Sequence, residues 1–252
     1  MRLDVIGAGP AYPDRPGATG AAYLLRLGGA GLLLDLGQGS FPRLAGHLDP
    51  ADLEAVVISH LHPDHFIDLV PLRHYLRWEK PSRRIRVLGP AGLADRLDGL
   101  HGEPGFSAAA LDIEDLVEGR STVGPFELQV ARVRHADPSF GFRVSHAGKP
   151  DARGLVYSGD CGRAEDLDAL TRPGDTLLCE VSFGAGPVVP DAEHLDGPAV
   201  GTLARRVSAG RVLLTHLQMG FDRAATVDSV RARFDGGSVE LVDPGFETTI
   251  EI

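Results

Sequence analysis

The sequence of 252 residues predicts an α/β protein, and three observations support this fold class. Short apolar runs of strand length alternate with segments of helical periodicity along the whole chain. Polar residues with reactive side chains directly follow several of these runs, as expected for the functional edge of an open α/β sheet. No tract rich in Pro, Gly or Ser divides the chain, so we expect a single domain over 1–252.

The first half of the chain contains five strand signals, each bounded by polar or Gly-rich turns. The expected strands are 3–6, 22–27, 32–34, 56–58 and 85–88. Apolar residues at helical spacing predict a helix over 66–78, where Pro71 is tolerated because it lies near the first turn. A shorter helix is expected over 92–100. Residues 101–107 contain Gly and Pro and are expected to form a loop.

The second half continues the alternation, and 126–130 shows the strict apolar–polar pattern of a half-exposed strand. The other expected strands are 140–144, 155–157, 177–181, 211–214, 239–242 and 246–250. The expected helices are 165–170, 198–207 and 227–234.

Composition limits the classes of partner. The net charge of −10 and a pI of about 5.4 disfavour a large nucleic-acid surface, because an acidic protein repels phosphate backbones. A small anionic substrate remains compatible, since bound cations dominate the field of a metal site. No apolar run approaches the ~20 residues of a membrane span. The N-terminal residues show no apolar region of the kind found in signal peptides, so we expect no signal peptide here. Two cysteines, Cys161 and Cys179, are expected as free thiols in the cytoplasm.

Four potential metal ligands lie within the six residues His60-Leu61-His62-Pro63-Asp64-His65, directly after the strand at 56–58. Imidazole and carboxylate groups suit zinc and related ions. His60 and His62 stand two residues apart in an extended segment, so both side chains can bind one ion. Asp64 and His65 fall where the chain turns into a helix and can bind a second ion.

Three further candidate ligands, His135, Asp160 and His216, each follow an expected strand. Each one alone has a structural explanation, such as a capping aspartate or a hydrogen-bonded histidine. Together with the cluster at 60–65 they supply seven ligands, the number needed for two ions that share one carboxylate.

These motifs resemble those of the metallo-β-lactamase superfamily. The resemblance covers nearly the whole chain and rests on residues in the order that the family shows, namely Asp35-Leu36-Gly37-Gln38-Gly39, Ser59 to His65, His135, Ser158-Gly159-Asp160 and Leu214-Thr215-His216. It implies a four-layer αβ/βα sandwich with the metals at one edge.

The resemblance also implies a ligand set. One ion would be bound by His60, His62 and His135, and the other by Asp64, His65 and His216, with Asp160 bridging the two. Two Zn²⁺ ions are expected, with Mn²⁺ as the alternative. Asp35 matches an aspartate that usually supports the ligands from behind, although the residue itself is equally compatible with a turn before Gly37.

Within the superfamily the chain is most similar to ribonuclease Z-type phosphodiesterases, through the segments 135–144, 178–181, 193–195 and 213–217. In those enzymes a histidine at the position of His194 contacts the scissile phosphate or protonates the leaving group, and a glutamate near Glu180 assists it.

The chain differs from ribonuclease Z in one respect. Only 24 residues separate His135 from Asp160, where ribonuclease Z carries a long tRNA-binding arm. The resemblance therefore favours small phosphodiesters over tRNA. Such small relatives often form homodimers, and the sequence leaves the oligomeric state open.

The resulting hypothesis is a dinuclear metal-dependent hydrolase of small phosphodiesters or cyclic nucleotides. A hydroxide bridging the two ions would attack phosphorus, Asp64 would orient the water or accept its proton, and His194 would assist the leaving group. One alternative is a lactone, thioester or other acyl hydrolase on the same metals. The other is a relative that binds a metal and a ligand without turnover.

Overall fold

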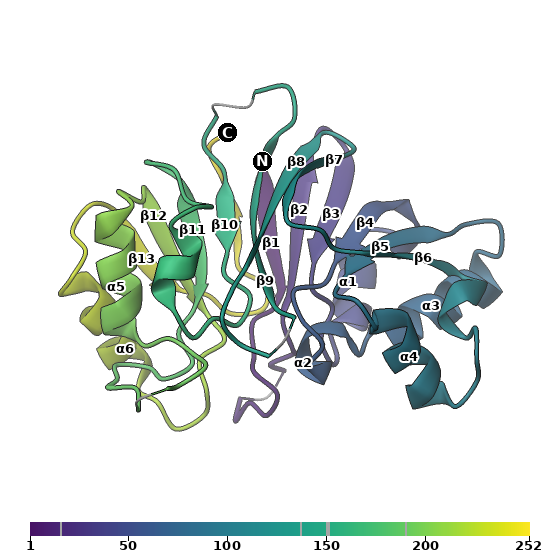
Figure 1. The fold of residues 1–252 in the computed structure, drawn as a ribbon, viewed down its shortest axis with the longest axis horizontal. Coiled ribbons are helices and arrows are strands. Elements are labelled where there is room, and N and C mark those ends of the chain that lie inside the picture. Colours follow the sequence, from purple (N-terminus) through teal and green to yellow (C-terminus); the bar gives the residue numbers. More distant parts are fainter. Residues whose placement is uncertain (16, 137, 150–151, 190) are drawn as a thin grey trace.

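Two mixed β-sheets lie face to face in the computed structural model, which describes residues 1–15, 17–136, 138–149, 152–189 and 191–252 (Figure 1). Within these residues each sheet has seven strands. The strand order is β14-β1-β2-β3-β4-β5-β6 in the first sheet and β13-β12-β11-β10-β9-β8-β7 in the second. The last strand of the chain pairs antiparallel with the first, so both ends of the chain belong to the first sheet.

The first sheet is built almost wholly from the N-terminal half. Its strands are β1 (Arg2–Gly7), β2 (Ala22–Leu27), β3 (Ala30–Leu34), β4 (Leu53–Val57), β5 (Ile85–Gly89), β6 (Leu111–Asp115) and β14 (Glu247–Thr249). The helices of this half are α1 (Phe41–His47), η1 (Pro50–Asp52), α2 (Pro63–Phe66), α3 (Leu69–Glu79), α4 (Leu93–His101) and η2 (Ser107–Ala109).

The second sheet comes from the C-terminal half. Its strands are β7 (Gly119–Val123), β8 (Phe126–Arg132), β9 (Phe140–His146), β10 (Leu155–Tyr157), β11 (Thr176–Glu180), β12 (Arg211–Thr215) and β13 (Ser238–Leu241). Its helices are η3 (Ala164–Leu167), α5 (Gly197–Arg206) and α6 (Arg223–Arg231).

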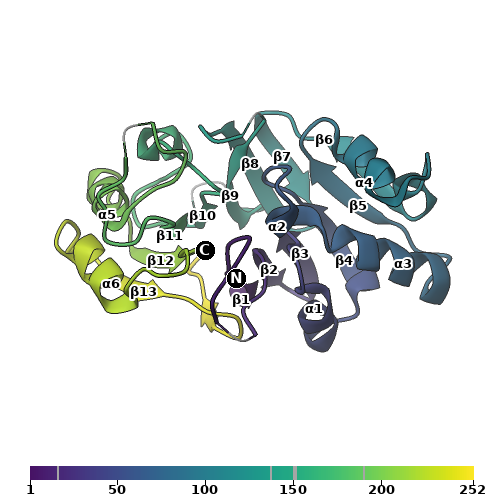
Figure 2. The ribbon, with the colours of Figure 1, turned by 90° about the horizontal axis from the view of Figure 1, so that it is seen from below.

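Three apolar layers hold the four layers of secondary structure together. Alternate residues of a strand face opposite sides, so Tyr23 and Leu25 of β2 pack between the sheets while Leu24 packs against the outer helices. A third cluster fills the space between the second sheet and α5 and α6. Figure 2 shows α1, α3 and α4 on one outer side and α5 and α6 on the other. The expected αβ/βα sandwich is confirmed.

The strands that precede the candidate ligands end at the same edge of the molecule. Strands β3 and β4 are parallel, and β10, β11 and β12 are parallel to one another. Strand β8 is antiparallel to β9, which is antiparallel to β10, so β8 also ends at this edge. The edge lies near α2, at the bottom of Figure 1 between the two halves.

Several elements differ from the expectation. The expected helix at 66–78 is mainly α3, which begins at Leu69 after the short helix α2. The two are separate because the backbone N–H of Asp68 donates to the carbonyl oxygen of Leu36, outside the helix, and Pro71 has no N–H to donate. Residues 165–170 form only the 3₁₀ turn η3.

The expectation missed α1, β6 and β7, together with the short 3₁₀ helices η1 and η2. Leu44 is the one buried residue of α1, and β7 is exposed along most of its length. Such edge elements carry little apolar periodicity. Within the described part of the chain, none of the helices is long and apolar enough to cross a membrane.

One ion pair is buried completely in the second sheet. The guanidinium of Arg143, at 1 % exposure, donates to both carboxylate oxygens of Asp175 at 2.7 and 3.0 Å. Asp175 also accepts hydrogen bonds from the backbone N–H groups of Gly154 and Arg172. The pair therefore ties β9 to the turns that precede β10 and β11.

Replacing Asp175 by asparagine should destabilise the fold by about 3–5 kcal/mol, because the buried guanidinium loses its counter-charge. Urea unfolding measures the loss. The control is Glu114→Gln, which removes the partner of Arg86 in an exposed pair and should cost less than about 1 kcal/mol. Equal losses in the two variants would contradict the assigned role of Asp175.

Candidate metal centre

The structure brings all seven candidate ligands together in two groups that share Asp160. In the second group, His216 Nε2 lies 3.2 Å from both His65 Nε2 and Asp64 Oδ2. Asp160 Oδ1 lies 3.4 Å from His65 Nε2 and 3.5 Å from His216 Nε2. All four residues of this group are buried.

The first group consists of His60, His62, His135 and Asp160. His135 Nε2 lies 3.1 Å from His62 Nδ1, and Asp160 Oδ2 lies 3.7 Å from both His60 Nε2 and His135 Nε2. His62 is exposed and His60 is completely buried, so this group reaches solvent on the side of His62.

The separations within the two groups fit metal binding. Zinc bonds of about 2.0–2.2 Å in a tetrahedral site place neighbouring ligand atoms about 3.3–3.6 Å apart. His60 Nε2 and Asp160 Oδ1 are buried and have no hydrogen-bond partner among the described residues. Unpaired buried polar atoms are costly unless another group binds them. The donor set and these two atoms therefore fit divalent ions.

The ring nitrogens that face away from the two groups have partners of their own. His135 Nδ1 lies 2.7 Å from the carbonyl oxygen of Glu193, and His65 Nδ1 lies 2.7 Å from Asp35 Oδ2. Such hydrogen bonds fix the tautomer and the direction of an imidazole, which leaves Nε2 free to bind a metal. The site is therefore pre-oriented for its ions.

Asp35 is not a member of either group and supports them from behind. Its carboxylate accepts hydrogen bonds from the backbone N–H and the hydroxyl of Ser59 at 2.6 and 2.8 Å, and from the Tyr157 hydroxyl at 2.6 Å. Asp35 has φ of 58°, a left-handed conformation that aspartate tolerates. The turn and the support expected at this position are thus both present.

Gly159 is required for the position of Asp160. It has φ of +56°, and a Cβ atom there would lie 2.8 Å from the carbonyl oxygen of Phe140 and 3.1 Å from Cβ of Ser59. Only glycine combines this conformation with such a close approach. The turn after β10 can therefore place Asp160 in its buried position at this edge.

Burial and charge set the protonation of the ligands in the absence of ions. Burial lowers the pKa of His60 well below its usual value, which keeps the imidazole neutral as metal binding requires. Burial also disfavours the cation of His65, but the charges of Asp160 and Asp35 outweigh it and raise the pKa of His65 well above its usual value. A metal ion must therefore displace a proton from His65.

His194 and Glu180 lie beside the two groups. His194 Nδ1 is 3.0 Å from Glu180 Oε1 and 3.9 Å from Asp160 Oδ2. Burial lowers the pKa of His194, but the hydrogen bond and charge of Glu180 outweigh it and raise that pKa to about 9. Glu180 is buried and also accepts hydrogen bonds from the backbone N–H groups of Cys161 and Leu195. Among the described residues its hydrogen bonds go to His194, Ser182 and backbone N–H groups and to none of the candidate ligands, so it positions His194.

Ser182, which the sequence did not single out, connects Glu180 to the second group. Its hydroxyl donates to Glu180 Oε2 at 2.7 Å and lies 3.0 Å from His216 Nδ1. A hydroxyl has one proton, so the Ser182 oxygen accepts from His216 Nδ1–H. This arrangement directs Nε2 of His216 into the second group.

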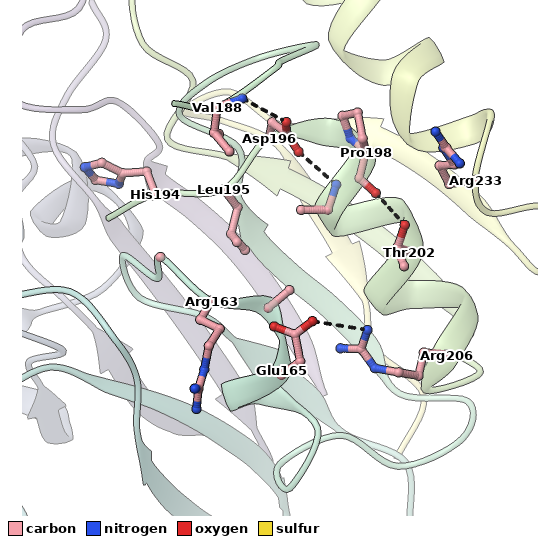
Figure 3. Close-up of a pocket in the computed structure, with 13 residues that line it drawn as sticks. Arg163, Glu165, Val188, His194, Leu195, Asp196, Pro198, Thr202, Arg206 and Arg233 are labelled. Atoms are coloured by element: carbon pink, nitrogen blue, oxygen red, sulfur yellow. Dashed lines mark hydrogen bonds and ion pairs between the residues drawn. The ribbon is translucent and has the colours of Figure 1, made fainter. Parts of the chain in front are cut away.

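A cavity of about 400 Å³ lies between η3 and α5 and adjoins the segment that carries His194 (Figure 3). Figure 3 shows the Leu195 side chain pointing into the cavity and the His194 ring pointing away from it. Arg163 and Arg206 at its rim pair with Asp166 and Asp168. Leu195 is nonetheless buried in the apolar cluster of the second sheet, so packing as well as the hydrogen bonds to Glu180 fixes the position of this segment.

Other residues considered from the sequence lie elsewhere. His101 stacks on Phe106 at the end of α4, with ring centroids 4.0 Å apart, and belongs to neither group. Asp137, part of the segment after His135, lies outside the described residues. Cys161 and Cys179 are free and buried, as expected.

A four-layer sandwich with paired His/Asp groups at one edge defines the class of metal-dependent hydrolases. The chain belongs to the β-lactamase superfamily, because the family model described as "Beta-lactamase superfamily domain" matches residues 33–217. The likeness to ribonuclease Z is confirmed as well. Ribonuclease Z of Mycolicibacterium paratuberculosis is 29 % identical over 247 residues, covering 86 % of this chain and 85 % of that protein.

Two other relatives match the same share of this chain or a larger one. An uncharacterized protein of Mycobacterium tuberculosis is 32 % identical over 246 residues, covering 94 % of this chain and 88 % of the relative. The probable metallo-hydrolase YhfI of Bacillus subtilis is 26 % identical over 221 residues, covering 86 % and 87 %.

Solved structures agree on the fold. The crystal structure of YhfI gives a TM-score of 0.86 at 23 % identity and covers 98 % of both chains. The short form of human tRNase Z gives 0.74 at 23 % identity over the whole of both chains. A diphosphatase of the PhnP family gives 0.75 at 13 % identity, covering 100 % of this chain and 98 % of that one.

Replacing Asp160 by alanine should reduce the metal content of both groups, because this carboxylate is common to them. Mass spectrometry of metal-replete protein measures the ions per chain, with about two expected for the unaltered protein. The control is Asp52→Ala, since the side chain of Asp52 is 70 % exposed. Retention of two ions by the Asp160 variant would exclude a bridging role.

Replacing Ser182 by alanine should weaken ion binding in the second group by about 10–100-fold, because His216 loses the acceptor that fixes its ring. Competition with a chromophoric chelator measures the two dissociation constants. Ser182→Thr keeps the hydroxyl and should restore the affinity. Unchanged affinities in the alanine variant would contradict this role.

Proposed function

We propose that this protein is a metal-dependent phosphodiesterase of small substrates, such as simple phosphodiesters or cyclic nucleotides. The observation that carries this proposal is His194, which Glu180 positions beside the two ligand groups but which belongs to neither. Hydrolysis of an alkyl phosphodiester benefits from a group that can protonate the departing oxygen. The proteins similar to this chain include a ribonuclease Z and a diphosphatase, and these names support a reaction at phosphorus.

Two divalent ions, with zinc preferred over manganese, would polarise phosphoryl oxygens and lower the pKa of a bound water. Asp64 offers a second carboxylate oxygen that can orient this water or accept its proton. Nδ1 of His194 faces Glu180, which leaves Nε2 to donate a hydrogen bond or a proton to the leaving oxygen. Because Glu180 is itself hydrogen-bonded to backbone N–H groups, the His194 ring is positioned before substrate binds.

Two features favour a compact substrate over tRNA. Of the 24 residues between His135 and Asp160, β9 and β10 take up 140–146 and 155–157, so the interval is short for a tRNA-binding arm. The net charge is −10, and many of the surface arginines are paired with carboxylates, as Arg84 and Arg86 are with Asp112 and Glu114. A long polyanion would meet little uncompensated positive charge.

Replacing His194 by alanine should reduce kcat on a cyclic nucleotide by about 10²–10⁴-fold, because its alkoxide leaving group requires a proton. The loss on bis-p-nitrophenyl phosphate should be much smaller, since p-nitrophenolate leaves readily without one. Initial rates with zinc or manganese measure both effects, and metal content should stay unchanged.

His101→Ala is the matched control, because His101 lies outside both ligand groups. Equal losses on the two substrates would show that His194 is not the proton donor. Metal-replete protein that hydrolyses lactones or thioesters but no phosphodiester would overturn the proposed function in favour of acyl hydrolysis.

A further inference from the structure

A series of rings runs from the candidate ligands to the protein surface. The centroid of His194 lies 4.7 Å from that of His135 and 6.0 Å from that of Phe183. Phe221 continues the series at 6.4 Å from Phe183, with an interplanar angle of 86°. These are the separations of aromatic rings in contact. We call Phe183 and Phe221 the aromatic ridge.

The backbone holds the ridge in place. The N–H of Phe183 donates to the carbonyl oxygen of Leu195, next to His194. Gly184 has φ of +54°, and a Cβ atom there would lie 2.5 Å from the Phe221 ring. Phe221 directly precedes Asp222, whose carboxylate caps α6. The position of the ridge is therefore fixed relative to His194.

The ridge is open to solvent although it is apolar. Phe183 is only partly buried, and Phe221 is 36 % exposed. Met219, in the loop that follows His216, is 49 % exposed. Exposed apolar side chains that adjoin a polar site are typical of ligand-binding surfaces.

We propose that the substrate carries an aromatic base, which stacks on this ridge while its phosphodiester lies at the metal groups. This inference rests on the proposed function and narrows it to nucleoside phosphodiesters. Any nucleobase can stack on an aromatic side chain, because every base has a π-face. Because the ridge begins next to His194, its binding partner is better explained as a part of the substrate than as a separate protein.

The experiment compares two substrates with the same scissile bond. Adenosine 3′,5′-cyclic phosphate carries a base, and the 3′,5′-cyclic phosphate of 1-O-methylribose does not. Phe221→Leu keeps the apolar bulk but removes the ring, and Phe221→Ala removes both. Val117→Ala is the control, because Val117 is 77 % exposed in the turn after β6.

Both Phe221 variants should raise KM for the adenosine substrate by about tenfold and leave kcat nearly unchanged. The base-free substrate should be hydrolysed equally by all variants, and metal content should not change. A leucine variant that behaves like the unaltered protein on the adenosine substrate would overturn the inference. Equal losses on both substrates would also overturn it, since they indicate a structural role for Phe221.

Binding of adenosine 5′-monophosphate, measured by calorimetry, separates this inference from the proposed function. One outcome is that neither cyclic phosphate is hydrolysed while Phe221→Leu weakens this binding about tenfold. That result would support base binding by the ridge and contradict the phosphodiesterase proposal. Equal binding by the leucine variant and the unaltered protein would contradict base binding by the ridge, whatever the activity.

Discussion

The Asp160 carboxylate lies between two groups of ligand atoms, with one oxygen near each, and the arrangement of the site depends on this position. The residue is 2 % exposed, and its Oδ1 has no hydrogen-bond partner among the described residues. Gly159 allows the chain to turn sharply enough to bring it there. Because a buried anion is costly without compensation, Asp160 is compatible with the fold only where positive charge is gathered around it.

Two further buried carboxylates near the ligand groups are satisfied by hydrogen bonds. Asp35 and Glu180 are both buried, and each accepts hydrogen bonds from backbone N–H groups and from side chains. Ser59 and Ser182 link these carboxylates to the ligand histidines. The network that orients the imidazoles therefore also satisfies buried polar groups of the loops.

The layered fold gives these loops a rigid base. Each ligand segment follows a strand. Strands β4, β10 and β12 are buried along most of their length and β8 is half-exposed, and all four end at the same edge of the molecule. The first group opens to solvent at His62, and His194 lies next to it. The group that opens to solvent is therefore the one beside the proposed proton donor.

The sequence by itself determined the fold class, most of the strands and all seven candidate ligands. Ligands next to one another in the chain, such as His60 to His65, are visible as a local pattern, and His135, Asp160 and His216 are marked by the apolar strands before them. The weakly apolar edge elements β6, β7 and α1 left no such pattern.

Only the tertiary structure decided which atoms lie close enough to share an ion, which groups support them and what lies beside His194. Ser182, Tyr157 and Phe221 are ordinary residues in the sequence, and their roles arise from contacts with residues far away in the chain. Hydrophobic periodicity reports which face of an element is buried, but it does not report which polar atom another part of the chain will place within hydrogen-bond distance.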